Sequence, residues 1–177
     1  MLKFFWIDSV ILRGGIIMSL EIISGYDRED QVIELFSEYT KLLVDIMPLF
    51  GEYLKLQNYS NEEKHPGDKY AEPMGRLYLA YWDGQLAGCV ALRQIDAQHA
   101  ELKRMYVRPR FRRKHISRAL LNRIIADARE IGYACILLDT EPCLDAAIKL
   151  YLSSGFEFTE RYNDSPFDTT LFMKYIL

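Results

Sequence analysis

The chain has 177 residues, of which 50% are hydrophobic and 27% charged, and its formal net charge is −3. These values are typical of one globular domain with a sizeable core, and they exclude an intrinsically disordered chain. The acidic balance disfavours binding to long polyanions, so we expect no nucleic-acid partner. No apolar run approaches the roughly 20 residues that a membrane helix requires, so we expect no membrane association.

Cysteine and histidine usage gives no indication of a disulfide framework or a metal centre. The three cysteines are odd in number and form no C-x-x-C motif, and the three histidines are scattered through the chain. We therefore expect a protein without a metal ion, in a reducing, cytoplasmic environment.

Residues 1–17 are predicted to be an N-terminal extension, and residues 18–177 a single domain. The first residues hint at a signal peptide, but Asp8 and Arg13 interrupt the apolar stretch and no small-residue cleavage site follows. We expect either an additional edge strand or an over-long start, with Met18 as the initiator.

The domain is predicted to begin with a strand and two helices. The strand covers residues 20–24, and Asp27 is expected to cap a helix whose apolar residues recur with a period near 3.6. A weaker helix is expected over residues 50–56. The turn-rich segment 67–73 is expected to be a loop.

The next elements are predicted to be three strands and a long helix. Residues 76–82 and 85–92 flank Asp83-Gly84, a pair typical of a two-residue hairpin turn. A third strand is expected over residues 100–107. The clearest helix covers residues 115–131.

The chain is predicted to close with a strand, a helix and two more strands. The apolar run 135–139 indicates a buried strand, and residues 144–154 a helix that ends at Gly155. The closing strands are expected over residues 156–161 and 169–176. The order β-α-α-β-β-β-α-β-α-β-β predicts a mixed α/β sheet in one domain.

One segment is strongly basic. Positions 103–118 contain eight basic residues and no acid, so the rest of the chain carries −11, which is −3 minus +8. A basic region on an acidic body indicates a discrete anion site, and a solvated basic loop is the alternative interpretation.

The basic residues coincide with the predicted start of the long helix, which opens with Arg112-Arg113-Lys114-His115. A helix N-terminus carries about half a positive charge and up to four unpaired N–H groups, so acidic residues would be expected there. A pyrophosphate seated on these N–H groups would make the basic side chains favourable instead. The preceding strand directs the chain to this point, as in phosphate-binding βα turns.

The segments Met105-Tyr-Val-Arg-Pro109 and Arg112-Arg-Lys-His-Ile-Ser117 together resemble the coenzyme A motif of the GNAT acetyltransferase superfamily. In that motif a strand ending in V-x-P is followed by [Q/R]-x-x-G-x-[G/A], which opens a helix. Residues 70–107 further resemble a bacterial GNAT subgroup that mostly lacks an assigned substrate. The resemblance implies a GNAT-like fold, which is a mixed, mostly antiparallel twisted sheet flanked by helices, and acetyl-CoA as cosubstrate.

The same resemblance implies a set of residues that bind acetyl-CoA. The N–H groups of residues 113–118 would hold the pyrophosphate, and the backbone of the strand before them would pair with the pantetheine arm like an added strand. The implied residues are Met105, Tyr106, Val107, Arg112, Arg113, Lys114, His115, Ile116, Ser117 and Arg118.

Two of these positions depart from the family pattern. His115 stands where the family usually has glycine, and Ser117 where it has glycine or alanine. Glycine lets the backbone approach a phosphate without a Cβ. We expect His115 to have helical φ and ψ, which do not require glycine, and its imidazole to be either a phosphate donor or a surface group.

Three residues are candidates for the chemistry of acetyl transfer, which needs a base for the amine and an acid for the leaving thiolate. Tyr151 matches the tyrosine that many GNAT enzymes use as general acid, and a core tyrosine is the alternative. Glu101 matches the glutamate base of histone-type relatives, and a structural pair with Lys103 or an arginine is the alternative. Asp139 is a second candidate base, by its match to an acid in amino-terminal acetylating relatives.

The acceptor amine is expected to bind near residues 67–74, with Tyr70 and Glu72, and near the turn 162–164, because acids and aromatics suit a cationic amine. The predicted function is direct acetyl transfer from acetyl-CoA to a primary amine of a small molecule or peptide. A non-catalytic acyl-CoA-binding or sensing module is the alternative, motivated by the departures at His115 and Ser117. The sequence leaves open whether the protein forms a homodimer.

Overall fold

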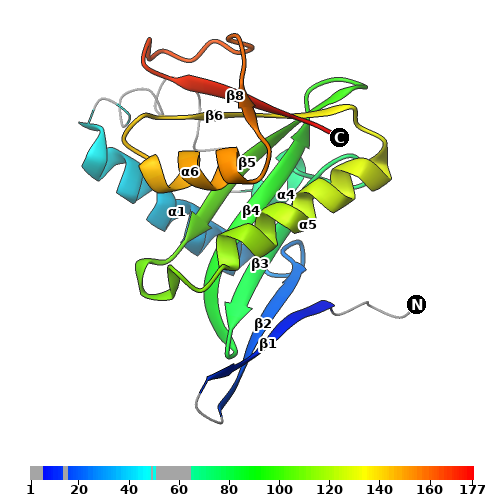
Figure 1. The fold of residues 1–177 in the computed structure, drawn as a ribbon, viewed down its shortest axis with the longest axis vertical. Coiled ribbons are helices and arrows are strands. Elements are labelled where there is room, and N and C mark those ends of the chain that lie inside the picture. Colours follow the sequence, from blue (N-terminus) through cyan, green and yellow to red (C-terminus); the bar gives the residue numbers. More distant parts are fainter. Residues whose placement is uncertain (1–5, 14–15, 49, 51–64) are drawn as a thin grey trace.

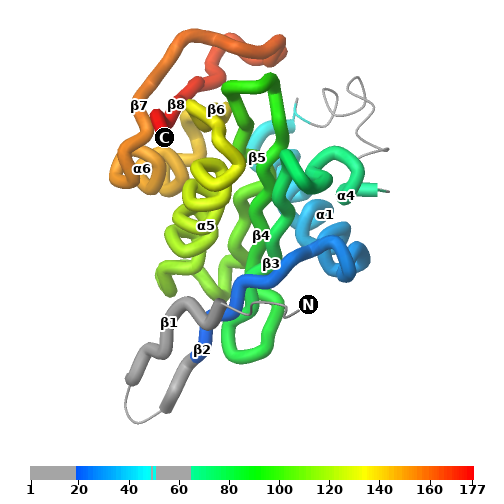
Figure 2. Tube along the Cα trace, turned by 90° about the vertical axis from the view of Figure 1, so that its right-hand side faces the viewer, coloured from blue at the N-terminus to red at the C-terminus, as the bar shows by residue number. Residues whose placement is uncertain are grey.

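The computed structural model describes residues 6–13, 16–48, 50 and 65–177, and these form one mixed sheet with helices on both faces (Figures 1 and 2). The sheet has eight strands in the order β1-β2-β3-β4-β5-β6-β8-β7. All neighbouring strands are antiparallel except β5 and β6, which are parallel. The predicted fold class, a mixed and mostly antiparallel sheet flanked by helices, is therefore confirmed.

The strands are β1 Trp6–Arg13, β2 Ile16–Ser24, β3 Arg76–Trp82, β4 Gln85–Gln94, β5 His99–Val107, β6 Cys135–Thr140, β7 Glu157–Phe158 and β8 Leu171–Ile176. The helices are α1 Glu29–Ile46, α4 Pro66–Lys69, α5 Ile116–Ile131 and α6 Asp145–Ser153, with a 3-10 turn, η1, at Pro109–Phe111. Among the described residues, no helix has the length and apolarity needed to cross a membrane.

Most predicted elements are present with bounds shifted by a residue or two. The strand predicted over 20–24 is longer, because β2 begins at Ile16, and β1 pairs with it as an edge strand. The assignment of Met18 as the initiator stays a prediction. The helix predicted over 50–56 lies, beyond Phe50, outside the described residues.

Three local predictions are wrong. Asp27 does not occupy the N-cap of α1, because the first helical N–H groups, of Gln31 and Val32, both donate to the carbonyl of Arg28. The predicted loop 67–73 begins with the short helix α4, which starts at Pro66, a residue that suits the first helical position. The strand predicted over 156–161 is reduced to two residues, since only β7 pairs with β8.

The helices lie on opposite faces of the sheet (Figure 2), and an apolar cluster holds them against each face. One cluster joins α5 and α6 to one face and includes Leu102 of β5 and Tyr151 of α6. The other joins α1 to the opposite face and includes Ala91 of β4 and Phe36 of α1. Because side chains alternate along a strand, neighbours of Leu102 in β5 project to the α1 face.

The central strands β5 and β6 separate partway along their length. Their ladder has three pairs, and the last joins Glu101 to Leu137. Farther along, β5 carries a β-bulge, because Val90 of β4 stands opposite two residues, and Arg104 has a φ of 56° there. The C-terminal half of β5 thus leaves an open edge toward β6 in the part of the chain that the structure describes.

The chain enters α5 through two residues with left-handed backbone conformation. Arg113 has a φ of 62°, and His115, the N-cap residue of α5, has a φ of 61°. The expectation of helical φ and ψ at His115 is therefore wrong. The turn between η1 and α5 needs a positive φ at this position, which explains why glycine is usual there in the resembling motif.

Replacing His115 with glycine is expected to raise the free energy of unfolding by about 1 kcal/mol. The left-handed conformation costs a residue with a Cβ about 1–2 kcal/mol, and the larger entropy of unfolded glycine offsets part of the gain. Urea denaturation measures the change.

The matched control is Ser117→Gly, at an ordinary helical position two residues farther on, which should lower stability by up to about 1 kcal/mol. A loss of stability in His115→Gly equal to that of the control would contradict the left-handed conformation.

Candidate active site

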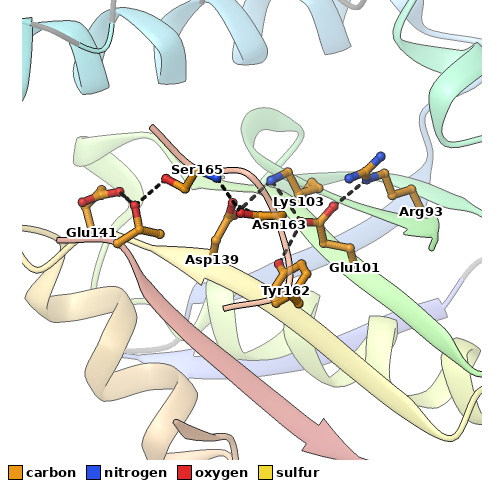
Figure 3. Close-up of polar contacts among 9 residues, drawn as sticks. Arg93, Glu101, Lys103, Asp139, Glu141, Tyr162, Asn163 and Ser165 are labelled. Atoms are coloured by element: carbon orange, nitrogen blue, oxygen red, sulfur yellow. Dashed lines mark hydrogen bonds and ion pairs between the residues drawn. The ribbon is translucent and has the colours of Figure 1, made fainter. Parts of the chain in front are cut away.

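Four charged side chains form a row across β4, β5 and β6 on the sheet face that α1 covers (Figure 3). Arg93 comes from β4, Glu101 and Lys103 from β5, and Asp139 from β6. Arg93 and Glu101 are direct cross-strand partners, and Glu101 belongs to the last pair before β5 and β6 separate. The signs of the charges alternate along the row.

Glu101 is 0% exposed and its carboxylate is fully engaged. Arg93 Nε donates to Oε2 at 2.5 Å, and the hydroxyl of Tyr162 donates to Oε1 at 2.8 Å. Lys103 Nζ is a weaker third donor at 3.4 Å. Burial, together with the charges of Asp139 and Glu101, raises the pKa of Tyr162, so this phenol stays protonated as a donor. The predicted structural pairing of Glu101 with Lys103 and an arginine is thus present.

Asp139 remains charged and reachable. Burial favours its neutral form, but the charge and hydrogen bond of Lys103, 2.9 Å from Oδ1, together with the hydrogen bond of Asn163, outweigh this effect, and the pKa of Asp139 lies below its usual value. Asn163 Nδ2 donates to Oδ2 at 2.9 Å. The side chain of Asp139 is 26% exposed, in contrast to that of Glu101.

Tyr151, on α6, is the remaining candidate for the chemistry. Its ring packs against Phe156 at a centroid distance of 5.6 Å, and the residue is 5% exposed. Burial raises its pKa, and the negative charge of Asp139 raises it further, so the phenol is protonated at all ordinary pH values. Within the described residues its hydroxyl has no hydrogen-bond partner. The charge of Asp139 thus acts on the phenol of Tyr151, which places the two groups within electrostatic range of each other.

Of the eight cations of the basic segment, Arg104 and Arg110 lie over the rings of Phe36 and Phe111, and the other six divide into two groups. Lys103 forms ion pairs with Asp139 and Glu101, and Arg108 forms ion pairs with Glu34 and Glu38 of α1. These two cations therefore have structural partners within the protein. Within the described part of the chain, the cations at the start of α5 have no carboxylate partner; they are Arg112, Arg113, Lys114 and Arg118.

The start of α5 fits an anionic group. It has no side-chain cap and no acidic residue in its first turn, so its first N–H groups are not satisfied by a side chain. Lys114 lies 4.8 Å from the ring centroid of Trp82, and Arg118 donates to the hydroxyls of Ser153 and Ser154. These contacts direct both cations without neutralising them. The predicted cofactor-binding residues 112–118 thus form one basic turn, and residues 105–107 form the open edge of β5 that leads to it.

The predicted amine-binding residues are divided by the structure. Tyr70 is fully buried against Phe36 in the α1 cluster, because its ring fills the apolar layer between helix and sheet, so its assignment to the amine-binding side is wrong. Glu72 is exposed. Tyr162 and Asn163, from the predicted turn, do contact the charged row.

Sequence reasoning missed Arg93, which had no motif to mark it. The signal was the register of the second hairpin: Ile95 and Asp96 pair with His99 through backbone bonds, and this places Arg93 opposite Glu101. The sequence also did not indicate that the segment after β7 stabilises the charged residues of the sheet. Ser165 bonds to Thr170, which donates to the buried carboxylate of Glu141.

Residues 36–156 match the acetyltransferase (GNAT) family. An uncharacterised N-acetyltransferase of Schizosaccharomyces pombe is 33% identical over 139 residues, covering 77% of this chain and 85% of its own. An IAA acetyltransferase of Azospirillum brasilense is 34% identical over 131 residues, covering 72% and 78%.

A solved structure of the PaiA N-acetyltransferase of Thermoplasma acidophilum, in complex with coenzyme A, has a similar fold. Its TM-score is 0.68 at 19% identity, and the match covers 90% of this chain and 99% of that one. The family match spans more than half of the chain and includes both the basic turn and Tyr151. The chain therefore belongs to the GNAT family of acetyltransferases, enzymes that use acetyl-CoA as cosubstrate.

Proposed function

We propose that this N-acetyltransferase moves the acetyl group of acetyl-CoA directly to a primary amine of a small molecule or peptide. One observation carries the proposal: a charged, partly exposed carboxylate, Asp139, lies within electrostatic range of a buried, protonated phenol, Tyr151. Direct transfer needs these two groups, one on the amine side and one on the thiol side of the acetyl carbon.

Asp139 is the proposed base. It accepts a hydrogen bond from the acceptor amine and takes its proton as the new C–N bond forms. Its low pKa keeps it ionised at neutral pH, and Lys103 and Asn163 fix its orientation. Glu101, the base favoured by the sequence, has 0% exposure and three donors already in place, so we assign it a positioning role instead.

Tyr151 is the proposed acid. It donates the proton of its hydroxyl to the sulfur as the C–S bond breaks, and regains a proton from solvent before the next turnover. Unperturbed tyrosine titrates near ~10 and a thiol near ~8.5, so the transfer is mildly uphill. A hydroxyl without a competing partner in the described residues is free to turn toward the sulfur.

Acetyl-CoA supplies the activated acetyl thioester. We propose that its pyrophosphate is held by the N–H groups and side chains of residues 112–118, and that its pantetheine arm lies along residues 105–107. The absence of an acidic cap at α5 and the open edge of β5 support this arrangement. We also propose a cytoplasmic location, supported by three cysteines that are all free thiols.

Two measurements together test the function. Acetyl-CoA should bind with a Kd below roughly 1 mM, about −4 kcal/mol, by calorimetry, and CoA thiol should be released in the presence of amines. Binding without thiol release from any amine would favour the acyl-CoA-binding module. Failure of both acetyl-CoA and CoA to bind would remove the proposal.

Tyr151→Phe is expected to lower kcat by about 100-fold and leave the KM for acetyl-CoA within a few-fold, since a general acid typically contributes 10²–10⁴. Because its hydroxyl has no hydrogen-bond partner in the described residues, the thermal midpoint should barely change. Thiol release and a thermal melt measure the two effects.

The matched control is Tyr175→Phe, which removes a hydroxyl bonded to Arg129 instead and should keep wild-type turnover. Unchanged kcat in Tyr151→Phe would remove this residue as the acid and leave it a core tyrosine.

A further inference from the structure

We infer that the acceptor is an amino acid or a close analogue, with a carboxylate a few bonds from its amine, and that Arg93 binds this carboxylate. The inference rests on the proposed function, because it completes the acceptor end of the same site. It follows from the geometry of Arg93 and from the order of charges along the row.

Arg93 presents an unused edge of its guanidinium. Its side chain is 36% exposed, and only Nε is engaged, by Glu101. The two terminal nitrogens make no hydrogen bond with any residue that the structure describes. A guanidinium in this state offers parallel N–H donors to a carboxylate, which is the ligand that matches its fork.

Glu101 fixes the direction of that edge. A carboxylate with 0% exposure cannot move to another partner without leaving a buried charge unpaired, so its bond to Nε holds the arginine in place. Cross-strand pairing of the two residues adds a second constraint from the backbone. Glu101 therefore acts on the acceptor through Arg93, as a positioning residue.

The ends of the row have opposite charges. Asp139, which accepts the amine, lies at one end, and Arg93 lies at the other, with Lys103 and Glu101 paired between them (Figure 3). An amino acid carries the complementary pair of charges, an ammonium and a carboxylate, a few bonds apart. A simple amine would satisfy Asp139 and leave the cation of Arg93 facing a second cation in the same site, which is unfavourable.

Arg93 and Asp139 are two strands apart, with one ion pair between them, so the acceptor is small. An amine and a carboxylate separated by a few bonds can reach both ends with hydrogen bonds of about 2.8 Å. A long polyamine or an internal lysine of a folded protein lacks the carboxylate at this spacing.

The decisive experiment uses the unaltered enzyme and matched pairs of acceptors. Thiol release is measured with glycine, β-alanine, γ-aminobutyrate, aspartate and glutamate, each against its carboxamide, and with a short peptide whose C-terminus is amidated. At least one amino acid should exceed its carboxamide in kcat/KM by about 30-fold or more, the typical effect of removing one partner of a charged pair.

Equal or better turnover of the carboxamides, or of the amidated peptide, would overturn the inference and leave the proposed function standing. Silence with every amine would overturn the proposed function, and the inference with it.

Variants of Arg93 then identify the group responsible. Arg93→Gln should raise the KM for the preferred amino acid about 30-fold or more, while the KM for acetyl-CoA and for the carboxamide stays within a few-fold. Arg93→Lys keeps the positive charge but loses the fork of parallel donors, so its KM for the amino acid should lie between that of the wild type and that of Arg93→Gln. This intermediate value would show that the effect of Arg93→Gln does not come from a folding defect. The matched control is Arg129→Gln, which removes an arginine of α5 that bonds to Tyr175. This variant should keep the wild-type kcat and KM values for both substrates.

Glu101→Gln separates positioning from catalysis. A positioning role predicts a raised KM for the amino acid with kcat changed by less than a few-fold and an unchanged pH profile. A fall in kcat of about 100-fold, with loss of the acidic limb of the profile, would make Glu101 the base and overturn its assignment as the support of Arg93.

Discussion

A carboxylate with no exposed surface, in the middle of a sheet, must be compensated by its neighbours, because an unpaired buried charge costs several kcal/mol. Glu101 meets this requirement with donors from three places: Arg93 on the adjacent strand, Lys103 on its own strand, and Tyr162 beyond β7. Each donor is drawn to a fixed position by the same charge. Lys103 also bonds to Asp139, so the position of the proposed base on β6 depends on the buried carboxylate on β5.

Much of the fold could be predicted from the sequence because its signals are local. The Asp83-Gly84 turn sets the register of β3 and β4, and the glycines after α5 and α6 have positive φ values, as a helix stop requires. The wrong predictions concern residues whose burial or backbone conformation depends on contacts with distant parts of the sequence. Tyr70 lies in a turn-rich segment but fills a gap under α1, and the backbone of His115 is set by the path from η1 into α5.

The site was predictable in part, for the same reason. The basic turn and Tyr151 belong to motifs that are continuous in the sequence. Arg93 belongs to no motif, and its relation to Glu101 exists only after the hairpin aligns the two strands. The choice between Glu101 and Asp139 depended on exposure, which follows from how the segment after β7 folds over the sheet, and no pattern of residue types determines that.

The separation of β5 and β6 also bears on the lifetime of the protein. After the pair Glu101–Leu137, the sheet has an interrupted ladder at its centre, and a pantetheine arm along β5 would complete it. A ligand that binds only the folded state stabilises it by RT ln(1 + [L]/Kd), about 2.7 kcal/mol at a hundredfold excess over Kd. The fraction of unfolded chains exposed to proteolysis would then fall when acetyl-CoA is plentiful, which links the abundance of the enzyme to the supply of its own cosubstrate.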